Sequence, residues 1–90
     1  PLADSFSLSQ AYPNPFNPVT SLVFNLLEEG NVMVWVYNLK GQVVSTLLSG
    51  HQAVGTYNLT WDASQSPSGI YFVKAESAEN MQTQKLMLIK

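Results

Sequence analysis

Several residue types that characterise common protein classes are missing from this sequence or scarce in it. The 90 residues include no cysteine, which excludes disulfides, thiolate metal sites and a cysteine nucleophile. Arginine is also absent, and four lysines stand against six acidic residues, so the formal net charge is −2. Because nucleic-acid binding and polybasic membrane binding both depend on clustered Lys and Arg, this balance argues against both kinds of partner. No apolar run approaches the roughly 20 residues that a membrane-spanning helix needs.

The residues that usually carry catalysis or metal binding are equally sparse. His51 is the single histidine, and no serine has a base at a spacing visible in the sequence. Asp62 has no second carboxylate at a spacing that would pair with it, so we expect it to cap the turn toward Ser64 rather than to bind calcium or act as an acid. The sequence therefore predicts no enzyme, no cofactor and no metal site. Hydrophobic residues nevertheless make up 46% of the chain, which suffices for one small globular core.

Apolar residues recur with a period of two from residue 20 onward, which is typical of β-strands. We expect strands at 20–26, 32–37, 42–48, 54–61, 70–76 and 81–89, preceded by one near 6–10. Polar turns separate them, including one at 49–52, and Gly41 is free to take a positive φ in the turn at 38–41. This pattern predicts an all-β fold, an antiparallel β-sandwich of about seven strands, with a closed barrel as the alternative. Residues 1–10 are expected to be a linker end or a first edge strand, and residues 11–90 the domain itself.

The same alternation predicts which side chains form the core. The strand at 20–26 turns Leu22, Phe24 and Leu26 to one face, and the next strand turns Val32, Val34 and Val36 to one face. Trp61 is in phase with Tyr57 and Leu59, so we expect it in the core as well.

A proline-rich segment, Tyr12-Pro13-Asn14-Pro15-Phe16-Asn17-Pro18, precedes these strands. Each proline fixes φ near −65° and pushes the residue before it away from the helical region, so the segment is expected to be an ordered, non-helical loop. We expect Tyr12 and Phe16 to anchor this loop on the core.

Taken in order, the motifs of the chain resemble the C-terminal sorting domain of type IX secretion substrates. The resemblance is carried by the motif at 12–18, by Leu22-x-Phe24-x-Leu26, by Val36-Tyr37-Asn38 with Gly41-Gln42, by Gly55, Trp61-Asp62 and Ser68-Gly69-Ile70-Tyr71-Phe72, and by Lys85-Leu86-Met87-Leu88-Ile89-Lys90. It covers about residues 10–90. The Ig-like domain of flagellar hook-capping proteins has a similar core pattern.

The resemblance implies an Ig-like β-sandwich at the C-terminus of a larger secreted protein of Bacteroidetes or related phyla. Such a domain is non-catalytic and directs its cargo to the cell surface or the medium after a transient stage in the periplasm. The implied partners are the outer-membrane translocon, a sortase-like peptidase and the preceding cargo domain. The chain opens on Pro1 without an initiator Met or a signal peptide, so we expect it to be a piece of a longer protein. Two alternatives stay open, an accessory module of a secreted enzyme that binds carbohydrate or acts as a spacer, and an assembly domain like that of the flagellar cap.

Two sets of residues are candidates for recognition by the secretion machinery. The first is the loop of Tyr12, Pro13, Asn14, Pro15, Phe16, Asn17 and Pro18, and the second is the final segment of Lys85, Leu86, Met87, Leu88, Ile89 and Lys90. Two expectations stay open for the final strand: it lies at a sheet edge, where unpaired backbone groups are open to a partner strand, or it has ordinary pairing within its sheet.

A third candidate is an apolar patch of outward residues on one sheet face. It comprises Val23, Met33 and Trp35, with Val43 beside them, at positions where similar domains tend to carry polar residues. Such a patch would contact the cargo domain, the translocon or a second copy in a weak homodimer. Trp35 is expected to be the one outward aromatic, which makes a poor platform for sugar stacking.

Overall fold

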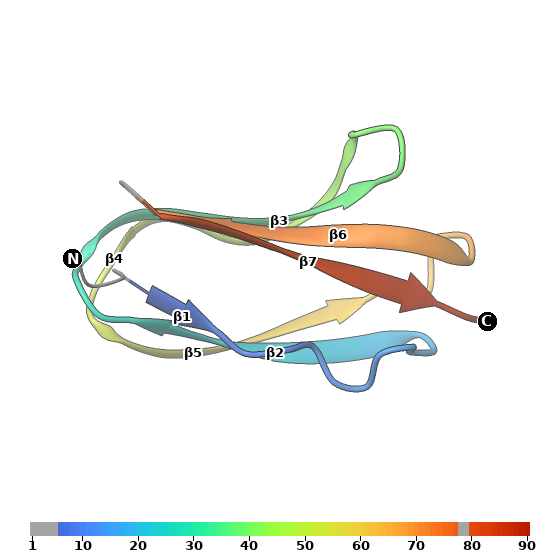
Figure 1. The fold of residues 1–90 in the computed structure, drawn as a ribbon, viewed down its shortest axis with the longest axis horizontal. Coiled ribbons are helices and arrows are strands. Elements are labelled where there is room, and N and C mark those ends of the chain that lie inside the picture. The colour runs from blue at the N-terminus through green and yellow to red at the C-terminus, as the bar shows by residue number, and fades with distance from the viewer. Residues whose placement is uncertain (1–5, 78–79) are drawn as a thin grey trace.

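Two facing β-sheets make up the computed structural model, which describes residues 6–77 and 80–90 (Figure 1). The strands are β1 (Phe6–Leu8), β2 (Val19–Leu26), β3 (Gly30–Asn38), β4 (Val43–Gln52), β5 (Gly55–Asp62), β6 (Gly69–Glu76) and β7 (Met81–Leu88). One sheet has the strand order β1-β2-β5 and the other the order β4-β3-β6-β7, and all of these pairings are antiparallel. The predicted all-β, Ig-like sandwich is confirmed.

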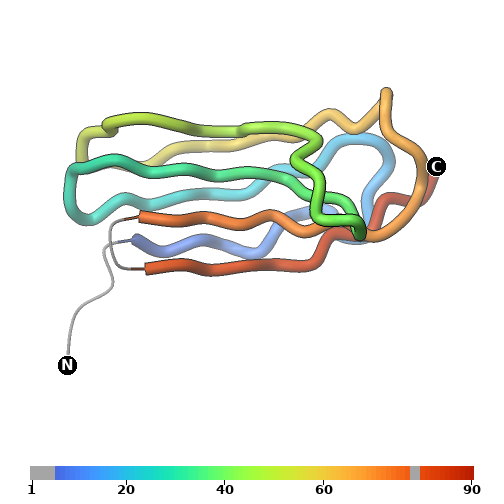
Figure 2. The backbone as a smooth tube through the Cα atoms, turned by 90° about the horizontal axis from the view of Figure 1, so that it is seen from above, coloured from blue at the N-terminus to red at the C-terminus, as the bar shows by residue number. Residues whose placement is uncertain are grey.

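The strands of both layers run along the long axis of the molecule, with the C-terminus at one end (Figure 2). Within the described residues there is no helix long and apolar enough to cross a membrane. Of the predicted linker end or edge strand at 1–10, Phe6–Leu8 forms an edge strand on β2, and the first five residues lie outside the described part of the chain.

The predicted turn at 49–52 is wrong, because β4 continues to Gln52. Gly50, His51 and Gln52 stay paired with the first residues of β3, and Gly50 takes a φ of 100° that other residues rarely adopt. The turn at 38–41 is placed as expected, with Gly41 at a φ of 80°.

Alternating side chains of both sheets fill the space between them. The buried apolar residues are Phe6, Ala11, Phe16, Leu22, Phe24, Leu26, Val32, Val34, Val36, Leu59, Trp61, Ala63, Tyr71, Val73, Ala75, Leu86 and Leu88. The two predicted core faces of β2 and β3 are confirmed by this set. Phe24 lies against Phe6, with ring centroids 5.1 Å apart, so β1 and β2 are joined by aromatic packing as well as by backbone pairing.

Three aromatic rings form the core at the end of the molecule where the chain terminates. The ring centroids of Phe16 and Trp61 are 5.5 Å apart, and those of Trp61 and Tyr71 are 5.0 Å apart. The hydroxyl of Tyr71 donates to the backbone carbonyl of Pro67 at 2.6 Å, which satisfies its polar end. Trp61 is therefore a core residue, as predicted.

We expect Phe24→Ala to lower the free energy of unfolding by about 3–5 kcal/mol, because it removes a fully buried ring between two strands. Val23→Ala, one residue away on the outward face, is the matched control and should change it by less than about 1 kcal/mol. Urea denaturation followed by tryptophan fluorescence measures both. Equal losses for the two variants would contradict the assigned core.

Candidate functional site

The proline-rich loop lies along the outer edge of β7, so the two predicted recognition segments are side by side. The backbone N–H of Phe16 donates to the carbonyl of Met87 at 2.9 Å, and the N–H of Ile89 donates to the carbonyl of Phe16 at 2.9 Å. Phe16 and Leu88 form a parallel bridge. The loop thus acts as a short additional strand at the edge of the four-stranded sheet.

Asn14 extends this pairing with its side chain. Its Nδ2 donates to the carbonyl of Lys85 at 2.9 Å, and its Oδ1 accepts from the N–H of Met87 at 3.0 Å. A side-chain amide offers one donor group and one acceptor, as a peptide unit does, so Asn14 takes the place of a backbone partner. Four outward backbone groups in succession are therefore bonded to the loop. They are the carbonyl of Lys85, the N–H and carbonyl of Met87, and the N–H of Ile89, the residue after β7.

The loop is also bonded to the three-stranded sheet. Tyr12 exchanges backbone hydrogen bonds of 2.8 and 3.1 Å with Ser21, and the hydroxyl of Thr20 donates to the carbonyl of Pro13 at 2.7 Å. Thr20 is buried, and this bond satisfies its hydroxyl. Because the loop bonds to both layers, it closes the sandwich between β2 and β7.

Gln84 continues the closure toward β1. Its Nε2 donates to the carbonyl of Ser9 at 3.0 Å, and its Oε1 accepts from the N–H of Ala11. Gln84 is not among the residues that the motifs predicted to be functional. The sequence does contain a signal for its role, because Gln84 is a polar residue in phase with Leu86 and Leu88, which are buried.

The expectation that the final strand offers an open edge is wrong for its second half. β7 is an edge strand by its position in the sheet, but the loop occupies the outward groups from Lys85 to Ile89. Covering an edge in this way is one of the means by which proteins avoid unwanted strand pairing.

The predicted anchoring by Tyr12 is also wrong, whereas that by Phe16 is confirmed. Tyr12 is 81% exposed and Phe16 is 2% exposed. Because Tyr12 pairs with Ser21, an outward residue of β2, it faces solvent, and its neighbour Ala11 takes the inward position.

The two segments predicted to be recognised together form one surface, which we call the loop–β7 surface. Its exposed residues are Tyr12, Pro13, Asn14, Pro15, Asn17, Lys85, Ile89 and Lys90, and Pro18 and Met87 are half-buried. Phe16, Leu86 and Leu88 are buried and belong to the core. A shallow hollow of roughly 480 Å³ lies at the junction, lined by Tyr12, Asn14, Gln84 and Lys85 among others.

The predicted apolar patch is not continuous. Val23 faces outward from β2, in the three-stranded sheet, whereas Met33 and Trp35 face outward from β3, in the other sheet. The turn between β2 and β3 carries the chain from one layer to the other, which separates these residues. Val43, on β4, is in register with Tyr37 and lies on the same sheet as Trp35.

Trp35 is not the one outward aromatic. Tyr37 shares its face at a centroid distance of 6.0 Å, and Phe72 is the cross-strand partner of Tyr37. The rings of Trp35 and Tyr37 are inclined at 75°, and Lys74 Nζ lies 5.9 Å from the centre of the Trp35 ring. The rings of Trp35 and Tyr37 are therefore not arranged as a coplanar platform on which sugar rings could stack.

Asp62 caps its turn as predicted. Its Oδ1 accepts from the backbone N–H of Ser64 at 3.0 Å and from the Ser64 hydroxyl. The hydroxyl bond first, then the backbone bond and the more distant charge of Lys90, hold the pKa of Asp62 below its ordinary value. Across residues 6–77 and 80–90, no group of three His, Asp or Glu side chains lies close enough to hold a metal ion.

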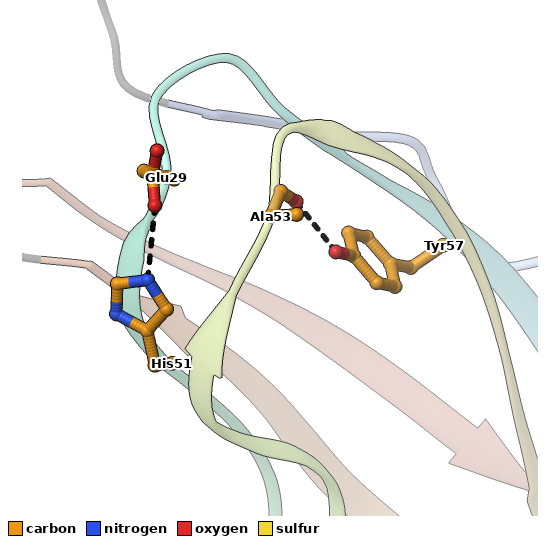
Figure 3. A network of polar contacts seen from close by, with 4 residues as sticks. All are labelled: Glu29, His51, Ala53 and Tyr57. Atoms are coloured by element: carbon orange, nitrogen blue, oxygen red, sulfur yellow. Dashed lines mark hydrogen bonds and ion pairs between the residues drawn. The ribbon is translucent and has the colours of Figure 1, made fainter.

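His51 lies at the opposite end of the sandwich, beside the turn between β2 and β3 (Figure 3). Its Nε2 is 3.1 Å from Glu29 Oε2, and both side chains are more than half exposed. Exposed pairs of this kind contribute little to stability. The neighbouring hydroxyl of Tyr57 donates to the carbonyl of Ala53, which fixes the turn between β4 and β5.

Comparison with known families agrees with this architecture. The family model described as a secretion system C-terminal sorting domain matches residues 10–90. The chain therefore belongs to the family of type IX secretion sorting domains, as its motifs predicted. No curated protein was found to match it. The likeness to flagellar hook-capping domains stays a prediction.

We expect Asn14→Ala to lower the free energy of unfolding by about 1–2 kcal/mol, because it leaves the Lys85 carbonyl and the Met87 N–H without their partner. Asn17→Ala, an exposed residue of the same loop, is the control and should change it by less than about 0.5 kcal/mol. Urea denaturation measures both. An effect of Asn14→Ala no larger than that of the control would show that the amide does not hold the loop.

We expect Ser64→Ala to raise the pKa of Asp62 toward the ordinary value of an aspartate, since the variant loses the hydroxyl bond to the carboxylate. The lowered pKa means that this capping interaction stabilises the fold at neutral pH and is lost as the pH falls through the pKa of the folded state. Carboxyl ¹³C NMR titration measures the pKa. Ser66→Ala, in the same loop, should leave it unchanged, and an unshifted value in Ser64→Ala would refute the assignment.

Proposed function

We propose that this domain is a non-catalytic sorting signal that directs a larger cargo protein through the type IX secretion system to the cell surface or the medium. The family match over residues 10–90 is the observation that carries the proposal. The loop–β7 surface supports it, because it joins the family's opening motif and its final motif at one place on the molecule.

The signal in this proposal is a folded surface rather than a linear peptide. Asn14 and Met87 are separated by 73 residues in the chain, and only the folded sandwich holds them at hydrogen-bond distance. Phe16 and Leu88 bury their side chains, so each segment depends on the core for its conformation. A partner that binds the loop–β7 surface would therefore bind only folded molecules.

The proposed partners follow from this role. The domain folds in the periplasm and presents the loop–β7 surface to the outer-membrane translocon, and a sortase-like peptidase then separates it from the cargo. Tyr12 and Ile89 are the large apolar side chains that this surface exposes, at 81% and 52%. Aromatic side chains are enriched among the residues that dominate binding energy at interfaces, which favours Tyr12 as the main contact.

An export assay tests the proposal. Residues 1–90 are fused to the C-terminus of a periplasmic reporter in a host with type IX secretion, and the reporter is measured in the medium and on the cell surface. We expect export of the full fusion and periplasmic retention of a fusion lacking residues 81–90. If the full fusion stays in the periplasm while its domain is folded, the sorting function is wrong.

A matched pair of variants separates a folded signal from a linear one. Leu59→Asp places a charge in the core and should abolish export, although it leaves both recognition segments intact. Thr60→Asp places the same charge at the exposed neighbouring position and should be exported. Export of an unfolded Leu59→Asp fusion would contradict the folded-surface mechanism and leave the sorting function standing.

A further inference from the structure

The four sheet edges of this sandwich are protected to very different degrees. The loop covers the second half of β7, and β1 has only three residues. β4 is interrupted by two register shifts against β3, and such irregularities make an edge a poor template for pairing. β5 differs from all three, because its eight residues pair with β2 in unbroken register and contain neither proline nor lysine.

Alternate residues of β5 direct their backbone groups away from β2. In an antiparallel sheet each residue bonds to one neighbouring strand only, and successive residues alternate between the two sides. Ser21 bonds to Tyr12, so its partner in β5, Thr60, turns its N–H and carbonyl to the free side. By the same alternation Asn58 and Thr56 do likewise, and within residues 6–77 and 80–90 no strand pairs with this side of β5.

The side chains of β5 leave this edge uncovered. The Thr56 hydroxyl donates to Asn25 Oδ1 at 3.2 Å, and the Thr60 and Ser21 hydroxyls are 3.2 Å apart, so both threonine side chains are bonded to β2. The outward-bonding residues Thr56, Asn58 and Thr60, and Asp62 by the same alternation, are all exposed. The free backbone groups are therefore accessible to a strand that approaches in the plane of the sheet.

This edge is complementary to itself. Its outward groups are placed symmetrically about Asn58, so a two-fold axis at Asn58 pairs Asn58 with Asn58 of the second copy and Thr56 with Thr60. The one charged residue of β5, Asp62, would then face position 54, where Val54 stands, so no like charges oppose each other. The register therefore needs no partner other than a second copy of the same strand.

We propose that β5 is an interface with a second copy of this chain, in which two β5 strands pair antiparallel about a two-fold axis at Asn58. The two three-stranded sheets then form one continuous six-stranded sheet. The contact consists of one strand pair and lies at the small end of specific interfaces, so the dimer is weak and forms in a concentration-dependent way. This interface is independent of the proposed sorting function.

Single cysteines test the two-fold register, because the chain has none of its own. In Asn58→Cys the two thiols face each other at a Cα separation of about 5.5 Å, within the range of a disulfide. In Thr56→Cys, on the same edge, they are more than about 13 Å apart. With oxidised glutathione, non-reducing gels should show Asn58→Cys dimers forming about tenfold faster than Thr56→Cys dimers. A mixture of Thr56→Cys and Thr60→Cys should form the mixed dimer at the faster rate.

Sedimentation velocity of the unmodified chain and of charge variants provides a second test of the interface. The chain should show a concentration-dependent dimer that Asn58→Lys weakens by about fivefold or more. Thr83→Lys introduces the same charge at an exposed site on β7 and should leave the dimer unaltered. Mixing Asn58→Lys with Asn58→Asp should restore the dimer. A monomeric chain at every concentration, or equal crosslinking of Asn58→Cys and Thr56→Cys, would overturn the interface. Neither result would bear on export, so the two proposals fail separately.

Discussion

The bonding of the proline-rich loop to both sheets is the interaction on which the rest of this structure depends. Proline removes backbone donors, so a segment with three of them in seven residues can pair only at selected positions. Those positions are Tyr12, Asn14 and Phe16, which bond to β2 on one side and to β7 on the other. The loop thereby seals a sheet edge that would otherwise be open, and it covers the aromatic core around Trp61.

This closure brings the opening motif of the family, at 12–18, into contact with the final motif, at 85–90. The loop takes backbone partners from both β2 and β7, and β7 would expose unpaired backbone groups without the loop. A secretion machinery that binds their common surface would bind only folded domains, although the area of contact is small. The aromatic face around Trp35 and the free edge of β5 lie on other parts of the sandwich, so they are available for contacts that do not interfere with the loop–β7 surface.

The period-two pattern predicted the number and order of the strands and their core faces, because inward positions of a sandwich strand are mostly apolar whatever their distant neighbours are. It did not predict that β4 continues through residues 49–52. Local turn chemistry was equally readable, as in the capping of Ser64 by Asp62. The sequence did not reveal that Asn14 bonds to β7, since that contact joins residues more than seventy positions apart and leaves no local signal. The division of Val23 and Met33 between two sheets was missed for a related reason, because alternation predicts a face of a strand but not the layer to which the strand belongs.

Hydrogen exchange of two backbone amides tests the central claim most directly. The N–H of Phe16 donates to the carbonyl of Met87 in β7, and the N–H of Ile89, the residue after β7, donates to the carbonyl of Phe16. If the loop and β7 form one cooperative unit, NMR-detected exchange should show both amides protected and opening with the same free energy, and Asn14→Ala should lower that free energy equally for both. A Phe16 amide that exchanges like an exposed loop residue while Ile89 stays protected would contradict the account.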